Sequence, residues 1–237
     1  MTVTVPVSRR GPGIAVSGLA AGAVLLAGCG GAVTGRPVAA EQTVVSRHID
    51  AQLGSLLPDP SQFPGKYPAV VLPAEAAAQA AGDLNGIARG ATVQPDGCVP
   101  PQQSFGPDQT AIVVGTDNDT RATMTVELTR TRQPLSALRT QLKRCGELRV
   151  NRAGATTTVR TELQAPPPVE ADDTLALRRT VAPDSGGAGL TQSMQTLTGQ
   201  VGDVRITVTY MIFSDGQADT ASLDELFTTA VQKVRKG

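Results

Sequence analysis

The chain has 237 residues, enough for one domain with a sizeable hydrophobic core in addition to an export signal and a linker. It carries 21 basic and 21 acidic residues without a basic stripe, which argues against nucleic acid as a partner. With four phenylalanines, two tyrosines and no tryptophan, it has little from which to build a surface that stacks on bases or sugars.

The N-terminal residues have the features of a bacterial lipoprotein signal. Two arginines precede an apolar stretch over residues 14–27, which is too short to span a bilayer as a helix. Residues 26–29 (Leu-Ala-Gly-Cys) match the lipobox at which such signals are cleaved. We therefore predict that residues 1–28 are a signal peptide and that Cys29 becomes a diacylated N-terminus. The alternative is an ordinary signal peptide in which Cys29 is incidental.

A diacylglyceryl anchor on Cys29 would decide where the mature protein works. Each buried methylene contributes about 0.8 kcal/mol, so two acyl chains hold a protein permanently at a membrane. We expect a lipid-anchored envelope protein at the extracytoplasmic face of the cell membrane. Residues 29–46, rich in glycine, alanine and threonine, would form a flexible tether, and residues 47–237 a single domain.

The first half of this domain predicts helices followed by a hairpin. A short helix is expected over residues 46–57 and a longer one over 74–84, with a proline-rich extended segment over 63–68 between them. Strands over 111–115 and 123–129 follow. The second strand alternates apolar and polar residues, which predicts a half-buried strand with one polar face.

A cluster of polar side chains, Asp117, Asn118 and Asp119, lies between these two strands. Its oxygen atoms would suit a calcium ion, because hard cations take oxygen ligands. Clusters of this composition are far more often simple hairpin turns. We predict a turn, and the sequence leaves open whether Asp117 to Asp119 bind an ion.

The helix that begins at Pro134 predicts a disulfide. Its leucines fall on one side at helical spacing, and Cys145 has the same phase, which directs its side chain into the core. Cys98, on the segment that enters the sheet, is the other cysteine that follows Cys29. Because exported chains mature in an oxidising compartment, we predict a Cys98–Cys145 disulfide. The alternative is two separately buried free thiols.

The second half predicts hairpins and a closing amphipathic helix, with a glycine-rich loop over residues 185–189. The helix would be capped by Ser222, with Glu225 completing a capping box. The expected strands cover residues 148–151, 156–163, 175–181, 192–198 and 204–213. Together these elements predict an α+β fold with a largely antiparallel, twisted β-sheet packed against helices.

Several features carry a resemblance to a known class of proteins. They are the lipobox and tether, residues 144–148 (Arg-Cys-Gly-Glu-Leu) running into a strand, the succession of hairpins, and the closing helix through Val231 and Val234. In these the chain resembles small actinobacterial, and in particular mycobacterial, cell-envelope lipoproteins. Over most of residues 46–237 it is similar to the extracellular sensor domain of the receptor kinase PknH. The resemblance implies a binding or sensing module without catalytic residues to carry over.

The sequence contains no constellation typical of an enzyme or a metal site. His48, the only histidine, lies beside the tether and is poorly placed for a Ser-His-acid triad. With Cys29 acylated, two cysteines and one histidine are too few for a zinc site. We therefore expect no catalytic residues, no metal and no cofactor.

We expect instead a non-enzymatic ligand-binding or sensor-like module. A domain with helices on a sheet can open an apolar cleft between the two layers, and its partner would be a lipidic small molecule or an envelope protein. The alternative is a structural or secretion-accessory factor that acts through protein contacts, which an exposed apolar patch without a cavity would favour. A histidine-free hydrolase is a third hypothesis.

Overall fold

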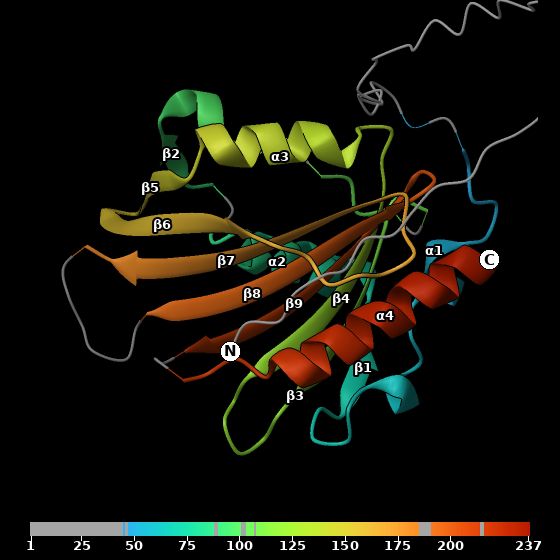
Figure 1. Ribbon diagram of the computed structural model, residues 1–237. Helices are drawn as coiled ribbons and strands as arrows, with labels where there is room; N and C mark the ends of the chain where they lie inside the picture. Colours follow the sequence, from blue (N-terminus) through green and yellow to red (C-terminus); the bar gives the residue numbers. More distant parts are fainter. Residues whose placement is uncertain are drawn as a thin grey trace, which may run out of the picture. The chain divides into compact units, whose positions relative to one another are not determined.

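Nine strands pair in one antiparallel sheet with the order β1-β3-β4-β9-β8-β7-β6-β5-β2 (Figure 1). Four α-helices and two short 3₁₀ helices accompany the sheet within the described residues. In chain order the elements are α1 (Leu53–Leu56), η1 (Pro60–Gln62), β1 (Ala69–Val71), α2 (Ala74–Leu84), β2 (Thr92–Gln94), η2 (Asp96–Cys98), β3 (Thr110–Thr116), β4 (Thr123–Arg130), α3 (Leu135–Arg144), β5 (Glu147–Arg152), β6 (Ala155–Gln164), β7 (Asp173–Pro183), β8 (Gln192–Val201), β9 (Val204–Phe213) and α4 (Thr220–Lys236). The predicted α+β class with a largely antiparallel sheet is confirmed.

The computed structural model describes residues 45, 47–87, 90–100, 103–106, 108–184, 191–213 and 216–237. The predicted signal peptide, Cys29, nearly all of the predicted tether and the predicted glycine-rich loop lie outside these residues. Within the described part of the chain, no helix is long and apolar enough to cross a membrane.

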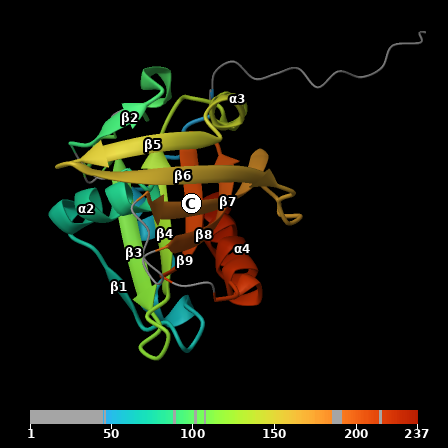
Figure 2. The same ribbon diagram turned by 90° about the vertical axis from the view of Figure 1, so that its left-hand side faces the viewer.

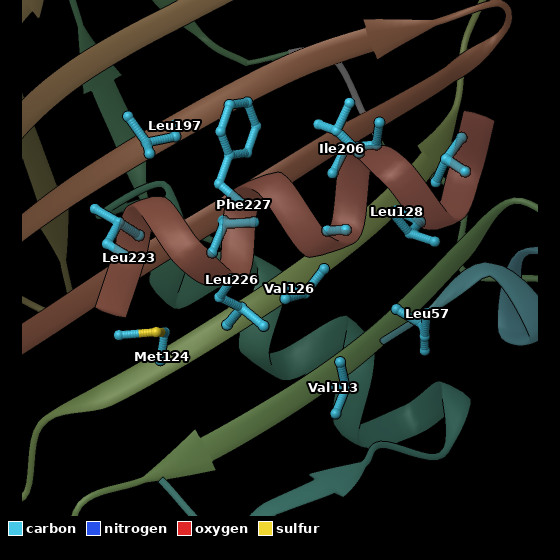
Figure 3. Packing of buried hydrophobic residues seen from close by; sticks show 14 of the residues in the cluster. Leu57, Val113, Met124, Val126, Leu128, Leu197, Ile206, Leu223, Leu226 and Phe227 are labelled. Atoms are coloured by element: carbon cyan, nitrogen blue, oxygen red, sulfur yellow. The ribbon is translucent and has the colours of Figure 1, made fainter. Parts of the chain in front are cut away.

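One face of the sheet is covered by α4, and the main core lies between them (Figure 3). Phe227 and Val231 of the helix are fully buried against apolar residues of β4, β8 and β9. The packing is close at Gly199 of β8, where a Cβ would lie 3.3 Å from Val231 Cγ2 and 3.4 Å from the Phe227 ring. The space between α4 and the sheet is therefore filled with side chains.

The opposite face of the sheet carries α2 and α3. In Figures 1 and 2, α2 and α4 lie on opposite sides of the strands. Helix α2 packs Ala81 against Ile112 of β3, and α3 packs Leu135 against Leu177 of β7. Because side chains alternate between the two faces of a strand, these strand residues belong to the face turned away from α4.

Helix α4 begins earlier than the sequence predicts. It starts at Thr220, and the carboxylate of Asp219 is its N-cap, accepting a hydrogen bond from the backbone N–H of Ser222. Ser222 therefore lies inside the helix, and the predicted capping box with Glu225 is wrong. The Asp219 carboxylate also lies 2.7 Å from Lys66 Nζ and accepts a hydrogen bond from the Tyr67 hydroxyl at 3.1 Å.

The predicted helix over residues 46–57 is reduced to the single turn of α1. The segment before α1 is tied to distant parts of the chain by hydrogen bonds from its backbone N–H groups. The N–H of Val45 donates to the carbonyl of Arg132 at 3.1 Å, and the N–H of Ile49 donates to Asp203 Oδ1 at 2.9 Å. These tertiary contacts, which the local sequence pattern does not show, determine the path of the segment.

The disulfide joins Cys98 and Cys145, with a Cα–Cα distance of 5.7 Å. It links η2 to the residue that follows α3, and both cysteines are buried in a small apolar cluster with Leu148 and Val159. The phase of the mid-chain helix thus predicts this pairing correctly, and the alternative of two free thiols does not hold.

Candidate functional site

A cleft of about 380 Å³ lies on the face of the sheet that carries α2 and α3. Its volume falls in the range typical of small-molecule sites. One wall is formed by α3, and the end of α2 and the segment around Gln103 also line it. Its floor is made of side chains from β4, β6, β7, β8 and β9, namely Glu127, Thr129, Thr161, Leu177, Arg179, Thr196, Thr198, Arg205, Thr207 and Thr209.

The cleft lies between helices and the sheet, on the face turned away from the last helix. Helix α4 itself packs directly on the strands of the other face. The polar face of β4, expected on the solvent side of a half-buried strand, is covered as well. Thr125 and Glu127 are both buried, so this strand is enclosed on both faces.

Arg179 of β7 extends from the floor to the end of α2. Its Nε donates to Thr161 Oγ1 at 3.1 Å and its Nη1 donates to the backbone carbonyl of Leu84 at 2.9 Å. Burial lowers the pKa of the guanidinium to about 10, which leaves it protonated at neutral pH. Within the described part of the chain it takes part in no ion pair.

Arg205 of β9 occupies another part of the floor, near a carboxyl group. Its Nη2 donates to the carbonyl of Gln133 at 2.7 Å and its Nε to Gln200 Oε1 at 3.3 Å. Burial lowers its pKa to about 10, and the negative charge of Glu127 opposes that shift. Burial raises the pKa of Glu127, against a 2.5 Å hydrogen bond from Gln103 and the charge of Arg205.

The charges that line the cleft do not balance. They belong to Arg130, Arg179, Arg205 and Glu127 among the described lining residues. Arg130 is neutralised by Asp203, with 3.0 Å between Nη1 and Oδ2. Two guanidinium groups therefore face one carboxyl group, and the cleft keeps an excess of positive charge whether Glu127 is ionised or not.

At the rim of the cleft, Arg130 belongs to a polar cluster that includes the only histidine of the chain. Asp203 Oδ2 lies 2.5 Å from His48 Nδ1, and Arg130 Nη1 lies 3.4 Å from the same ring nitrogen. The ring of His48 is more than half exposed, yet it is held by these contacts. This cluster fixes the first described residues of the domain to the β8–β9 turn.

The predicted site residues fall partly at this cleft. Cys98 and Cys145 both line it, so the disulfide forms part of its wall. Cys29 lies outside the described residues, and its lipidation stays a prediction. Within the described ranges, no three or more His, Cys, Asp or Glu side chains are grouped as a metal site would require.

The Asp117 cluster is a turn in the structure. Asp117 lies between β3 and β4, and its Oδ1 accepts hydrogen bonds from the backbone N–H groups of Asp119, at 2.9 Å, and Thr120, at 3.3 Å. These bonds, led by the one from Asp119, hold the pKa of Asp117 below its usual value. The carboxylate thus serves to close the hairpin.

The residues that sequence reasoning did not find are the charged ones on the floor. Arg205 stands between two apolar residues of the most regular strand, and Glu127 stands at the equivalent place in β4. A single charged residue within a long strand of alternating apolar residues can indicate a buried charge, because the polar face of such a strand can be covered by a helix. Arg179 has no comparable signal, since Arg178 precedes it.

No family model and no curated protein matches the chain. Similar solved structures include the crystal structure of the extracellular domain of PknH from Mycobacterium tuberculosis, with a TM-score of 0.50 and 13% identity; the match covers 81% of this chain and 100% of that one. An X-ray structure of an uncharacterized protein from Mycobacterium smegmatis, an Rv0999 ortholog, has a TM-score of 0.46 and 15% identity, covering 78% and 98%. At 13% identity, the likeness to PknH shows a shared fold.

Proposed function

We propose that this protein is a membrane-anchored envelope lipoprotein whose domain is a non-enzymatic, sensor-like module that binds a small ligand in the cleft between α2 and α3. The observation that carries the proposal is the cleft, which combines a polar floor with apolar walls. The lipobox before Cys29 supports the anchor, and the fold shared with an extracellular domain supports an extracytoplasmic location.

The cleft also separates this proposal from the alternative of a structural or secretion-accessory factor. An exposed apolar patch without a cavity would favour such a factor. The large exposed apolar residues of the described chain are Val70, Val71, Val99 and Phe213, of which only the first two are neighbours in sequence. A preformed cavity of ligand size therefore favours a binding module.

The chemistry at the cleft supports binding over catalysis. The two cysteines that line it are bonded to each other, so neither supplies a thiolate nucleophile. Among the threonine hydroxyls of the floor, Thr196 and Thr209 contact each other at 3.0 Å, and Thr161 accepts a hydrogen bond from Arg179. The described lining offers hydrogen-bond donors and charge, which are the groups that position a ligand.

The anchor is tested by replacing Cys29 with serine in an actinobacterial host. We expect the wild-type protein to be cleaved before Cys29, to incorporate labelled palmitate and to remain with membranes after a salt wash. The Cys29→Ser variant should incorporate no label and retain its signal peptide. Equal labelling of the two proteins, or an unacylated mature N-terminus in the wild type, would show that the lipobox is incidental.

Ligand binding is tested by filling the cleft. Thr207→Trp places an indole over the middle of the floor, whereas Thr140→Trp adds the same group to the exposed side of α3. Native mass spectrometry of protein purified from the actinobacterial host should show a bound small molecule for the wild type and for Thr140→Trp, and none for Thr207→Trp. A wild-type protein without bound mass, or one whose ligand survives Thr207→Trp, would refute the proposal.

A further inference from the structure

Resting on the proposed function, we infer that the cleft selects amphipathic anions, and that Arg179 holds their carboxylate or phosphate group. The guanidinium of Arg179 would distinguish such a ligand from a neutral or cationic molecule. Its hydrogen bonds, its missing counter-ion among the described residues and the apolar residues around it all favour this class of ligand.

The guanidinium of Arg179 is held in place by two hydrogen bonds, but one of its nitrogen atoms has no hydrogen-bond acceptor among the described residues. Its Nε and Nη1 atoms donate to Thr161 Oγ1 and to the Leu84 carbonyl, while Nη2 donates no hydrogen bond among the described residues. The only side-chain polar atom in the described chain that is fully buried without a partner is Thr123 Oγ1. The Nη2 atom is therefore accessible, and the cleft that Arg179 lines is where a ligand would reach it.

Arg179 also lacks the counter-ion that other arginines near this face possess. Arg130 pairs with Asp203, and Arg139 of α3 pairs with Asp173 at 2.8 Å. Removing a charge from water without a partner is costly, and a bound anion would offset that cost through a charge-assisted hydrogen bond. The arrangement is therefore stabilised by an anionic ligand more than by any other.

Arg205 is a less suitable anchor for the anion. The negative charge of Glu127 acts on it, so its own charge is partly balanced. On β8, Arg179 is paired with Met194 and Arg205 with Gln200, which places their Cα atoms on the order of 20 Å apart along the strand direction. One small anionic group cannot be held by both, and the Arg205 end offers polar contacts to the rest of the ligand.

The surroundings of Arg179 determine the remainder of the ligand. Leu84, Ile87, Leu142, Leu148 and Leu177 line the same cleft, and Leu177 is the next residue of β7 on the same face. An inorganic anion would leave the apolar surface that these side chains present to the cleft uncovered. A molecule with a short hydrocarbon portion would cover them and gain about 25 cal/mol for each Å² of apolar surface buried. An anion that carries an aliphatic chain fits both features.

The test compares four probes that share an eight-carbon chain and differ in head group: octanoate, octyl phosphate, octanol and octylammonium. Binding to the mature chain carrying Cys29→Ser, which has no acyl chains, is measured by isothermal titration calorimetry below the critical micelle concentration of each probe. We expect at least one of the two anions to bind about tenfold or more tightly than octanol, and octylammonium to bind most weakly. The ranking of octanoate against octyl phosphate then identifies the head group.

Arg179→Gln should lower the affinity for the preferred anion about tenfold or more and leave octanol binding unchanged. Arg178→Gln is the matched control, since Arg178 is exposed and adjacent on β7 but faces the other side of the sheet. It should bind like the wild type. Circular dichroism establishes that each variant is folded; should Arg179→Gln not fold, Arg179→Lys, which keeps the charge, is expected to retain the preference for anions over octanol.

The inference is overturned if neither anion binds, if octanol binds as well as the anions, or if Arg179→Gln and Arg178→Gln behave alike. These outcomes are distinct from failure of the proposed function. If a neutral probe binds the wild type but not the Thr207→Trp variant, the cleft is still a binding site, but it is not selective for anions.

Discussion

The carboxylate of Asp219 provides the sharpest test of how this fold is stabilised. It caps α4 and interacts with Lys66, with Tyr67 and with the backbone N–H of Ser222. Burial alone would raise its pKa, but these hydrogen bonds outweigh burial and lower the pKa to about 2, from an ordinary value of 3.8. Asp219→Asn removes the charge while keeping an oxygen that can cap the helix.

The size of the effect follows from the pKa difference. At about 1.4 kcal/mol per pKa unit, the depressed pKa of Asp219 contributes about 2.5 kcal/mol to the free energy of unfolding at neutral pH. Because the folded-state pKa lies below the unfolded one, this contribution is complete above about pH 5 and is lost as the pH falls from about 4 towards 2. We expect Asp219→Asn to lower the free energy of unfolding by about 2.5 kcal/mol at pH 7 and by almost nothing near pH 2.

The measurement is urea unfolding followed by far-ultraviolet circular dichroism at several pH values between 2 and 7, for the wild type and the variant. The difference between the two profiles isolates Asp219 from the other carboxylates. Asp224→Asn, an exposed acid in the first turns of the same helix, is the control and should give a small difference. Parallel profiles for wild type and Asp219→Asn across this range would refute the reasoning.

Three further changes test the packing and the cross-link. Phe227→Ala removes a fully buried ring and should cost about 3–5 kcal/mol in urea unfolding, and a loss below 1 kcal/mol would contradict the packing of α4. Gly115→Ala would place a Cβ 2.9 Å from the carbonyl oxygen of Tyr67, so we expect a loss of about 1–3 kcal/mol and a lower Tm by calorimetry. The double variant Cys98→Ser, Cys145→Ser removes a disulfide that joins residues 47 positions apart, and it should lower the free energy of unfolding by about 3–4 kcal/mol. A reductant should lower the stability of the wild type to the same level and leave that of the variant unchanged.

The elements that the sequence predicts correctly are those defined by local periodicity. The long strands of the last hairpin, α3 and α4 all show a regular apolar pattern. The shortest strands were missed for a physical reason. Strands β1 and β2 contain three residues each and exist because they pair with β3 and β5, which is long-range information. The same applies to α1, whose preceding segment is held by distant partners.

The candidate cleft was predictable only in part. Alternation in β4 sorts its side chains into an apolar and a polar face, but it does not reveal that α2 and α3 return over the polar one. The alternation alone therefore predicts that Glu127 and Arg205 face solvent, as they would in a fold with one helix layer on one sheet. A buried charge is recognisable only once the layers are known, since its environment is built by segments far away in the chain.

The cluster of His48, Arg130 and Asp203 has a topographic consequence for the anchored protein that we propose. Arg130 lines the cleft, and His48 is the second residue of the predicted domain after the tether, so the start of that domain lies beside a residue of the cleft lining. About 17 residues lie between Cys29 and the start of the predicted domain at residue 47, and a fully extended chain of that length spans at most about 60 Å.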